Sequence, residues 1–246
     1  MRRLLLAFAF LMPLTPMMIA AARAEEFTRT QIESIIHDYI ANHPKEMIDS
    51  VENYGKQQQM VEDQQASTLV QENMDWLVHN SKHAEAGSTK PDASIVEFFD
   101  YNCGYCKAAL PDLMTLLGTD KNLRIVFVEI PILGESSITA AKWALAANEQ
   151  GKYLPYHILL MKHKGPLDEA TLVDYAKRAG LDADKLKADK DSDKIARIID
   201  ENIGMARKLG IQGTPAFVVG DQLLRGYVGM DALRDALKTA REAEKK

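Results

Sequence analysis

The sequence is poor in cysteine and has no excess of positive charge. Its 246 residues contain two cysteines, and the formal net charge is −5. The absence of a basic bias argues against nucleic acid as a partner. Because both cysteines belong to one C-x-x-C motif, Cys103 and Cys106, the chain cannot form a disulfide between distant segments. A bridge that short closes almost no loop, so stability is a poor explanation for it.

A second cysteine pair is also missing, and this bears on metal binding. Structural zinc usually takes four protein ligands, so we predict thiol–disulfide chemistry and no structural metal site. The pair follows a predicted buried strand at 95–99 and opens a predicted helix at 103–117. Backbone N–H groups at a helix start stabilise a thiolate on Cys103. Cys106, one turn later, is close enough to attack a mixed disulfide formed by Cys103.

The first 24 residues have the pattern of a cleavable signal peptide. Arg2 and Arg3 precede an apolar run at 4–19, and the segment from Ala22 to Ala24 fits a small-x-small cleavage site. The alternative is an uncleaved membrane anchor, although two prolines break a run that is at the short limit for a span. No cysteine follows the site, so a lipid anchor has no attachment point. Export would place the motif in an oxidising compartment.

Residues 25–90 predict a helical region and linker. A first amphipathic helix covers 27–42, a second begins at Pro44, and a weaker helical pattern resumes up to His79. Between these, the glutamine-rich stretch 55–67 fits an exposed helix, a flexible linker or a segment that converts between the two, and 86–91 predicts a loop. One apolar stripe would be a long exposed surface without a partner, so we predict that it forms an oligomer interface. The stripe consists of Ile32, Ile35, Ile36, Tyr39, Ile40, Met47, Ile48 and Val51.

The remaining chain predicts an α/β domain with a helical insertion. A second strand at 123–128 follows the cysteine helix, which implies a parallel pair with a right-handed crossover. Helical patterns then fill about 134–210, with Ser136 or Ser137 available to cap the first of them. Strands at 213–219 and 222–225, joined at Gly220-Asp221, and a helix at 231–243 complete the domain.

This order of elements is the thioredoxin-like plan, and the inserted helices make it resemble the DsbA branch of exported thiol–disulfide oxidoreductases. The segment from Glu97 to Cys106 closely resembles the active-site segment of that branch. The N-terminal helical region resembles ScsC-type members, which carry an oligomerising stalk. The resemblance implies a signal peptide at 1–24, a stalk and linker at 25–90, and a catalytic domain at 91–246. It also implies a periplasmic location, disulfide-containing client proteins, and no cofactor besides the redox-active cysteines.

The resemblance assigns roles to the cysteines and to the residues that tune them. Cys103 is the expected nucleophile and Cys106 the resolving thiol. Gly104-Tyr105 stands where strongly oxidising DsbA enzymes carry Pro-His, so we expect a less oxidising couple. Thr214-Pro215 is the expected cis-proline loop facing the cysteines, which would let neighbouring backbone pair with an extended client peptide. The alternative for Pro215 is a proline at the start of an edge strand.

The resemblance also places a buried acid beneath the second cysteine, at the position of Glu97. Its expected role is to relay a proton to or from Cys106, with a pKa raised by burial. The alternative is an exposed strand carboxylate, in which case Asp100 competes for the role.

Three functions follow. The first is an exported disulfide isomerase or reductase that works as an oligomer, with a trimer favoured by resemblance over a dimer or monomer. Its partner would be a membrane thiol reductase of DsbD or ScsB type. The second is a monomeric DsbA-type dithiol oxidase. The third is a copper(I)-handling protein, since soft thiolates suit that ion and ScsC-type proteins are associated with copper tolerance.

Overall fold

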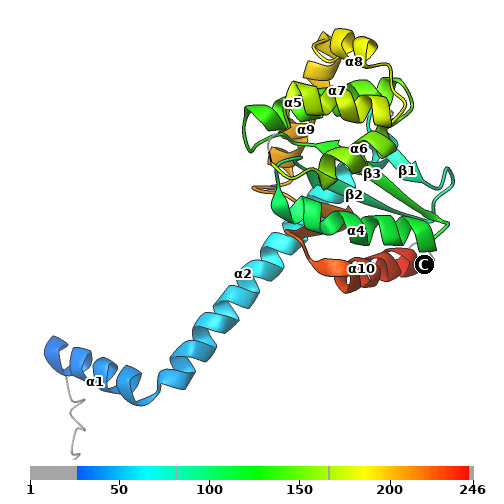
Figure 1. Ribbon diagram of the computed structural model, residues 1–246. Coiled ribbons are helices and arrows are strands. Elements are labelled where there is room, and N and C mark those ends of the chain that lie inside the picture. Colours follow the sequence, from blue (N-terminus) through cyan, green and yellow to red (C-terminus); the bar gives the residue numbers. More distant parts are fainter. Residues whose placement is uncertain (1–26, 81, 166, 244–246) are drawn as a thin grey trace, which may run out of the picture. The chain divides into compact units, whose positions relative to one another are not determined.

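The computed structural model describes residues 27–80, 82–165 and 167–243 (Figure 1). The predicted signal peptide, residues 1–24, lies outside the described residues. The chain divides into two units between Gly55 and Lys56. Each unit is described below by itself.

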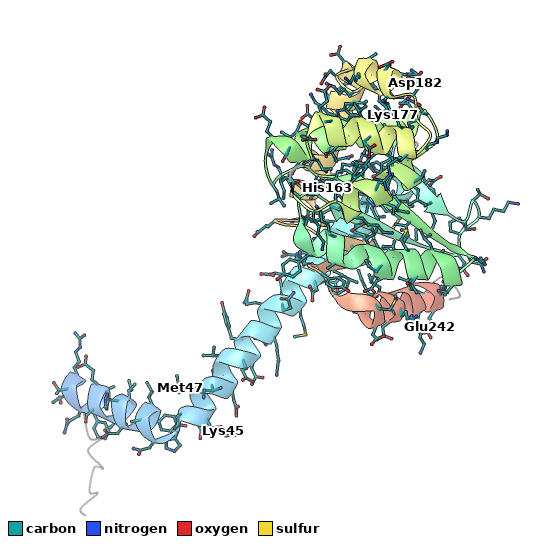
Figure 2. The ribbon with its side chains drawn as sticks, viewed as in Figure 1. Lys45, Met47, His163, Lys177, Asp182 and Glu242 are labelled. Atoms are coloured by element: carbon teal, nitrogen blue, oxygen red, sulfur yellow. The ribbon has the colours of Figure 1, made fainter. Side chains whose placement is uncertain are left out.

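The first unit contains helix α1 (Arg29–Asn42) and the start of α2 (Pro44–Glu72). Thr28 caps α1 through a capping box: its Oγ1 accepts from the Gln31 N–H at 3.3 Å, and its own N–H donates to Gln31 Oε1 at 2.9 Å. The Tyr39 hydroxyl donates to Glu46 Oε2 at 2.5 Å, which ties α1 to the first turn of α2. Met47 lies in the same stretch of α2 (Figure 2).

Every described residue of this unit is exposed, including all eight members of the predicted stripe. The exposed fractions reach 58% for Ile48 and 68% for Val51. The glutamine-rich stretch that follows is helical throughout, because α2 continues through it to Glu72. Of the alternatives predicted for that stretch, the structure shows the helix, which is exposed up to residue 65 and becomes buried at Ala66.

The second unit is organised around one mixed sheet with the strand order β1-β3-β2-β4-β5. Its strands are β1 (Ala84–Gly87), β2 (Ala93–Phe99), β3 (Leu123–Glu129), β4 (Ala216–Val219) and β5 (Gln222–Arg225). The β2–β3 pair is parallel, as the strand–helix–strand pattern predicts, and the other pairs are antiparallel. The thioredoxin-like α/β fold is confirmed.

Strand β1 corrects the sequence analysis, which predicted a loop that included Ala86 and Gly87. The strand has only four residues, and it exists because Ala84 to Gly87 pair with β3. That pairing is not visible in a local hydrophobic pattern. Gly87 also has a φ of 102° and lies against the Leu123 carbonyl, where a Cβ atom would clash at 2.3 Å.

Two hydrophobic cores cover the two faces of the sheet. One face packs on α4 (Gly104–Thr119), on α10 (Gly229–Ala243) and on the inserted helices. The other face is covered by the end of α2, by α3 (Met74–His79) and by the segment around Leu209. The alternation of side chains along β2 divides it between the two: Ile95 and Phe99 enter the first core, and Val96 and Phe98 enter the second.

The insertion between β3 and β4 is helical, as predicted. It contains α5 (Glu135–Glu149), α6 (Tyr153–Lys162), α7 (Glu169–Arg178), α8 (Ala183–Asp189) and α9 (Asp193–Lys208). The predicted cap of α5 is wrong: Gly134 is the N-cap residue, with no side-chain hydrogen bond. Ser137 lies buried inside the helix, where its hydroxyl donates to Asp100. Ser137 thus hydrogen-bonds to a carboxylate in the neighbouring loop and does not cap the helix, although serine is common at caps.

Candidate active site

Cys103 is the N-cap residue of α4 and lies at the end of the loop that follows β2. Its Sγ accepts a hydrogen bond from the Cys106 backbone N–H at 3.4 Å. On its other side Sγ lies 3.1 Å from the Thr214 carbonyl oxygen, to which the thiol donates when it is protonated. Gly104 and Tyr105, between the cysteines, are exposed, Tyr105 to 70%. The structure therefore brings together four of the residues that the sequence predicted at one site: Cys103, Cys106, Tyr105 and Thr214.

The two thiols have opposite acidities. The pKa of Cys103 is lowered to about 5, mainly by a hydrogen bond from the Cys106 thiol, and further by hydrogen bonds from the Thr214 side chain and from backbone N–H groups at the start of α4. Cys106 is fully buried, and burial together with the charge of Glu97 raises the pKa of its thiol far above the usual value. Cys103 is therefore a thiolate at neutral pH, whereas Cys106 keeps its proton.

Asp100 holds the loop between β2 and α4. Its carboxylate accepts hydrogen bonds from the backbone N–H groups of Asn102 at 2.7 Å and of Ile132 and Leu133 at 2.9 and 3.0 Å. It also accepts from the Ser137 hydroxyl at 2.7 Å. With this many donors committed to it, Asp100 fixes the loop geometry and has little capacity left for a proton relay.

Glu97 lies on β2, fully buried, and neither of its carboxyl oxygens has a hydrogen-bond partner among the described residues. Burial, and secondarily the charge of Cys103, raises its pKa to about 8. The exposed strand carboxylate that the sequence left open is therefore wrong. An unpaired buried carboxyl is costly, and such groups collect at sites that move protons.

The peptide bond between Thr214 and Pro215 is cis, as the sequence predicted. Pro215 directly precedes β4, which lies between β2 and β5 in the sheet and so is not an edge strand. The edge-strand alternative for this proline is therefore wrong. The loop presents the Thr214 carbonyl to Cys103.

Sequence reasoning missed a buried polar cluster behind the loop. The Tyr101 hydroxyl lies 3.0 Å from His157 Nδ1, and the Tyr153 hydroxyl donates to Glu129 Oε1 at 2.5 Å. The one available signal was an acidic residue at the end of the apolar strand 123–129. Its partners come from α6, more than twenty residues later, and no local pattern connects them.

The predicted stripe residues are not part of this site, because they belong to the other unit. Among the described residues there is no group of three or more His, Cys, Asp or Glu side chains that could hold a metal ion. Within the same residues, no helix is both long and apolar enough to cross a membrane.

Comparison with known proteins places this geometry in context. The profile of the DSBA-like thioredoxin domain family matches residues 94–238. The crystal structure of a thioredoxin-like oxidoreductase from Silicibacter pomeroyi is 40% identical, covers 68% of this chain and 97% of its own, and superposes with a TM-score of 0.66. ScsC from Proteus mirabilis in a transitional conformation is 28% identical, covers 87% of this chain and 97% of its own, with a TM-score of 0.67.

Curated relatives extend the match to larger proteins. A Na(+)/H(+) antiporter NhaA from Salinispora arenicola is 32% identical over 156 residues, which are 63% of this chain and 24% of the antiporter. The chain thus spans about a quarter of the length of the first curated relatives it matches.

Proposed function

The chain belongs to the family of DSBA-like thioredoxin domains, and from this we propose that it is a periplasmic thiol–disulfide oxidoreductase that repairs wrong disulfides in exported proteins. The observation that carries the proposal is the pairing of an acidic Cys103 with a protonated, buried Cys106 above an unpaired Glu97. This arrangement supplies an attacking thiolate, a resolving thiol and a proton acceptor in one place.

In the first step the Cys103 thiolate attacks one sulfur of a client disulfide. A new S–S bond joins Cys103 to the client, the client disulfide breaks, and the client's second sulfur leaves as a thiolate. The Cys106 thiol is a poor competitor for this step, because it is buried and protonated. Backbone beside the cis-proline loop at Thr214 and Pro215 is placed to pair with the client chain.

The first step also prepares the second. While Cys103 is a thiolate, its charge helps to keep the pKa of Glu97 high. Once Cys103 is bound in a neutral mixed disulfide, that repulsion is gone and Glu97 releases its proton more readily. The Glu97 carboxylate can then accept the proton of Cys106, and the Cys106 thiolate attacks Cys103 Sγ. The client leaves reduced by two electrons, and Cys103 and Cys106 are left as a disulfide.

Isomerisation uses the first step and its reversal. A client thiolate attacks the mixed disulfide, forms a new bond within the client, and releases Cys103 as a thiolate with no net transfer of electrons. A dithiol kept reduced by a membrane reductase of DsbD or ScsB type would favour this cycle. The absence of histidine between the cysteines also supports it over the oxidase function, because one source of thiolate stabilisation is missing.

We further propose that the exposed stripe on α1 and α2 joins copies of the chain, with a trimer favoured. Eight exposed apolar side chains along two helices form a surface that monomeric proteins rarely leave uncovered. Several active sites held around one client would raise the effective concentration of the attacking thiolate. The match to ScsC over 87% of this chain supports the comparison of the N-terminal helices as well as of the catalytic domain.

Rescue of a scrambled disulfide substrate tests the proposed isomerase function. The protein, kept reduced by a thiol buffer, should restore activity to a scrambled ribonuclease, and its Cys103→Ser variant should not. Oxidation of a reduced substrate without any rescue of the scrambled one would support the oxidase function instead. The outcome that contradicts both is a Cys103 that forms no mixed disulfide with either substrate.

A further inference from the structure

A chain of four buried polar side chains lies directly behind the redox loop. Tyr101 donates from its hydroxyl to the Tyr153 hydroxyl at 3.4 Å, and Tyr153 donates to Glu129 Oε1 at 2.5 Å. At the other end, Tyr101 and His157 Nδ1 are 3.0 Å apart. No member is more than 4% exposed. The mechanism proposed above uses none of these side chains.

The direction of these hydrogen bonds defines which of the four side chains carries each proton. A tyrosine hydroxyl has one proton, so Tyr101 cannot donate to Tyr153 and to His157 together. When Tyr101 donates toward Tyr153, His157 must carry its proton on Nδ1 and donate to Tyr101. His157 Nε2 is then a bare acceptor, and it has no partner among the described residues. In this state Glu129 is ionised and accepts the last hydrogen bond of the series, from the Tyr153 hydroxyl.

A second state differs by one proton. If Glu129 gains a proton from water, it can donate to Tyr153, Tyr153 to Tyr101, and Tyr101 to Nδ1 of His157, which then carries its own proton on Nε2. Only O–H and N–H bonds change, and the summed charge of the four side chains goes from −1 to zero. Burial raises the pKa of Glu129 to about 7 and lowers that of His157 to about 3, so His157 is neutral in both states.

The four hydrogen-bonded side chains are connected to the redox site through Tyr101. This residue precedes Cys103 by two positions, in the loop where the Cys103 N–H donates to the Asp100 carbonyl at 3.0 Å. Both Glu97 and Glu129 raise the pKa of Tyr101, so its hydroxyl lies within the field of both carboxyls. The strand register supports the same proximity: Glu129 is opposite Phe99, two positions from Glu97 on the same face of the sheet.

The groups that face Glu129 come from four elements. Helix α6 supplies Tyr153, which is bonded to Glu129, and the loop after β2 supplies Tyr101, which is bonded to Tyr153. Helix α6 also supplies His157, which lies beyond Tyr101. Helix α9 supplies Asn202, whose Nδ2 donates to the Glu129 carbonyl at 3.0 Å. Strand β2 carries Glu97, two positions before the residue that pairs with Glu129.

On the far side of Asn202, Lys82 pairs with Glu201 at 2.7 Å. His83 lies there, and burial lowers its pKa to about 4, so it is neutral. Among the described residues Glu129 has no ion pair, and its Oε2 has no hydrogen-bond partner. Its charge is therefore stabilised by the tyrosine chain and by no cation.

We propose that Glu129 is a positioning residue of the redox site: its charge, held by Tyr153 and Tyr101, opposes the ionisation of Glu97 and so sets the pH at which Glu97 can accept the proton of Cys106. Two like charges in a dry interior cannot both form freely, and they titrate as a coupled pair. This proposal rests on the proposed function, since it concerns the resolution of the mixed disulfide at the same site.

The test is the pH profile of mixed-disulfide resolution, between pH 5 and 9, in the full chain. A fluorescent peptide is attached to Cys103 and its release by Cys106 is timed. Glu129→Gln keeps an acceptor for Tyr153 and removes the charge, so the midpoint of the profile should fall by roughly one pH unit, the shift that a like-charge repulsion of about 1.4 kcal/mol produces. Tyr153→Phe should lower it by less. Glu242→Gln, an exposed change of equal charge on α10 (Figure 2), should leave it unchanged.

A background without Glu97 separates coupling from a structural effect. In Glu97→Gln the pH-dependent phase should be lost, and adding Glu129→Gln should change nothing more. A midpoint that stays in place in Glu129→Gln, or rates that fall by one factor at every pH, would overturn the proposal. If Glu129→Gln does not fold, Tyr153→Phe decides by the same criterion.

A second readout does not require exchange. The infrared absorption of protonated carboxyls should contain a band that titrates near pH 7 both in the parent and in Glu97→Gln, where the other buried carboxyl is removed. That band should be missing when Glu129→Gln is added to Glu97→Gln. A parent protein that shows this band but forms no mixed disulfide would refute the proposed function and leave Glu129 without a redox role. The absence of the band would refute the protonation of Glu129 itself.

Discussion

The two units of the chain contrast in where they keep their apolar side chains. In the first unit all described residues from Phe27 to Gly55 are exposed, although the stripe repeats at helical spacing. In the second unit the same kinds of residue fill two cores on the two faces of a sheet, and titratable groups that include Glu97, Cys106 and Glu129 are buried with them. Burial gives the second unit its chemistry, because it shifts pKa values. Exposure leaves the first unit with an apolar surface, and we propose that this surface joins copies of the chain.

Removal of the attacking thiolate should have the largest effect on the chemistry of the second unit. Cys103→Ser should lower the rate of exchange with a client disulfide by more than about 10³-fold, because Cys106 is buried and protonated. Cys106→Ser is the matched control: it should still attack and should accumulate the mixed disulfide, which a gel without reductant would show. If both variants lost the first attack on the client disulfide equally, Cys103 could not be the nucleophile with Cys106 as the resolving thiol.

Removal of the buried acid should have the next largest effect. Glu97→Gln should slow the release of client from Cys103 by about 10²-fold near pH 7, the lower range for loss of a positioned acid–base group. The first attack should change little, since the Cys103 thiolate is stabilised mainly by hydrogen bonds at the start of α4. Stopped-flow measurement of the two phases separates them. A slowed first phase with an unchanged second would contradict the relay.

The exposed stripe should matter for assembly and not for chemistry. Replacing Ile36 and Ile40 by glutamate should convert the protein to a monomer in light scattering, because the charges would have to be desolvated in an interface. The control replaces Gln57 and Gln58 by glutamate, a change of equal charge at exposed positions of α2 outside the stripe. A parent that is already monomeric would contradict the interface.

The last effect expected is a dependence of the stability of the reduced protein on pH. The pKa of Cys103 falls from the ordinary thiol value of 9.0 to about 5 in the folded chain. A lowered pKa stabilises the folded state fully above pH 9, and this stabilisation is lost as the pH falls through about 5. The reduced parent should therefore gain thermal stability relative to Cys103→Ser as the pH rises from 5 to 9. A constant difference in unfolding temperature across that range would contradict the thiolate assignment.

Features that depend on a few neighbouring residues could be predicted from the sequence, whereas features that depend on distant contacts could not. Cys103, Glu97 and Pro215 could be identified because the short segments that contain them resemble the active-site segments of the DsbA branch, and such a resemblance is visible in a few residues. The cis bond and the buried carboxyl are as predicted. The roles of these residues in exchange remain predictions.

The missed features depend on distant contacts. Strand β1 exists through its pairing with β3, and the polar cluster joins Tyr101 to α6, 52 residues further along the chain at Tyr153. Ser137 was predicted as a cap because serine is common there, but the Asp100 carboxylate binds it inside the helix. In each case a tertiary partner determines the outcome, and periodicity carries no information about that partner.

The central claim is that the buried site supplies exchange and the exposed stripe turns exchange into disulfide repair. The most direct measurement is the rescue of a scrambled ribonuclease by the parent and by the Ile36→Glu/Ile40→Glu variant, with the reactivity of Cys103 toward a small disulfide measured in parallel. We predict that the variant keeps the reactivity of Cys103 and loses most of the rescue. A monomeric variant that rescues as well as the parent would contradict the account.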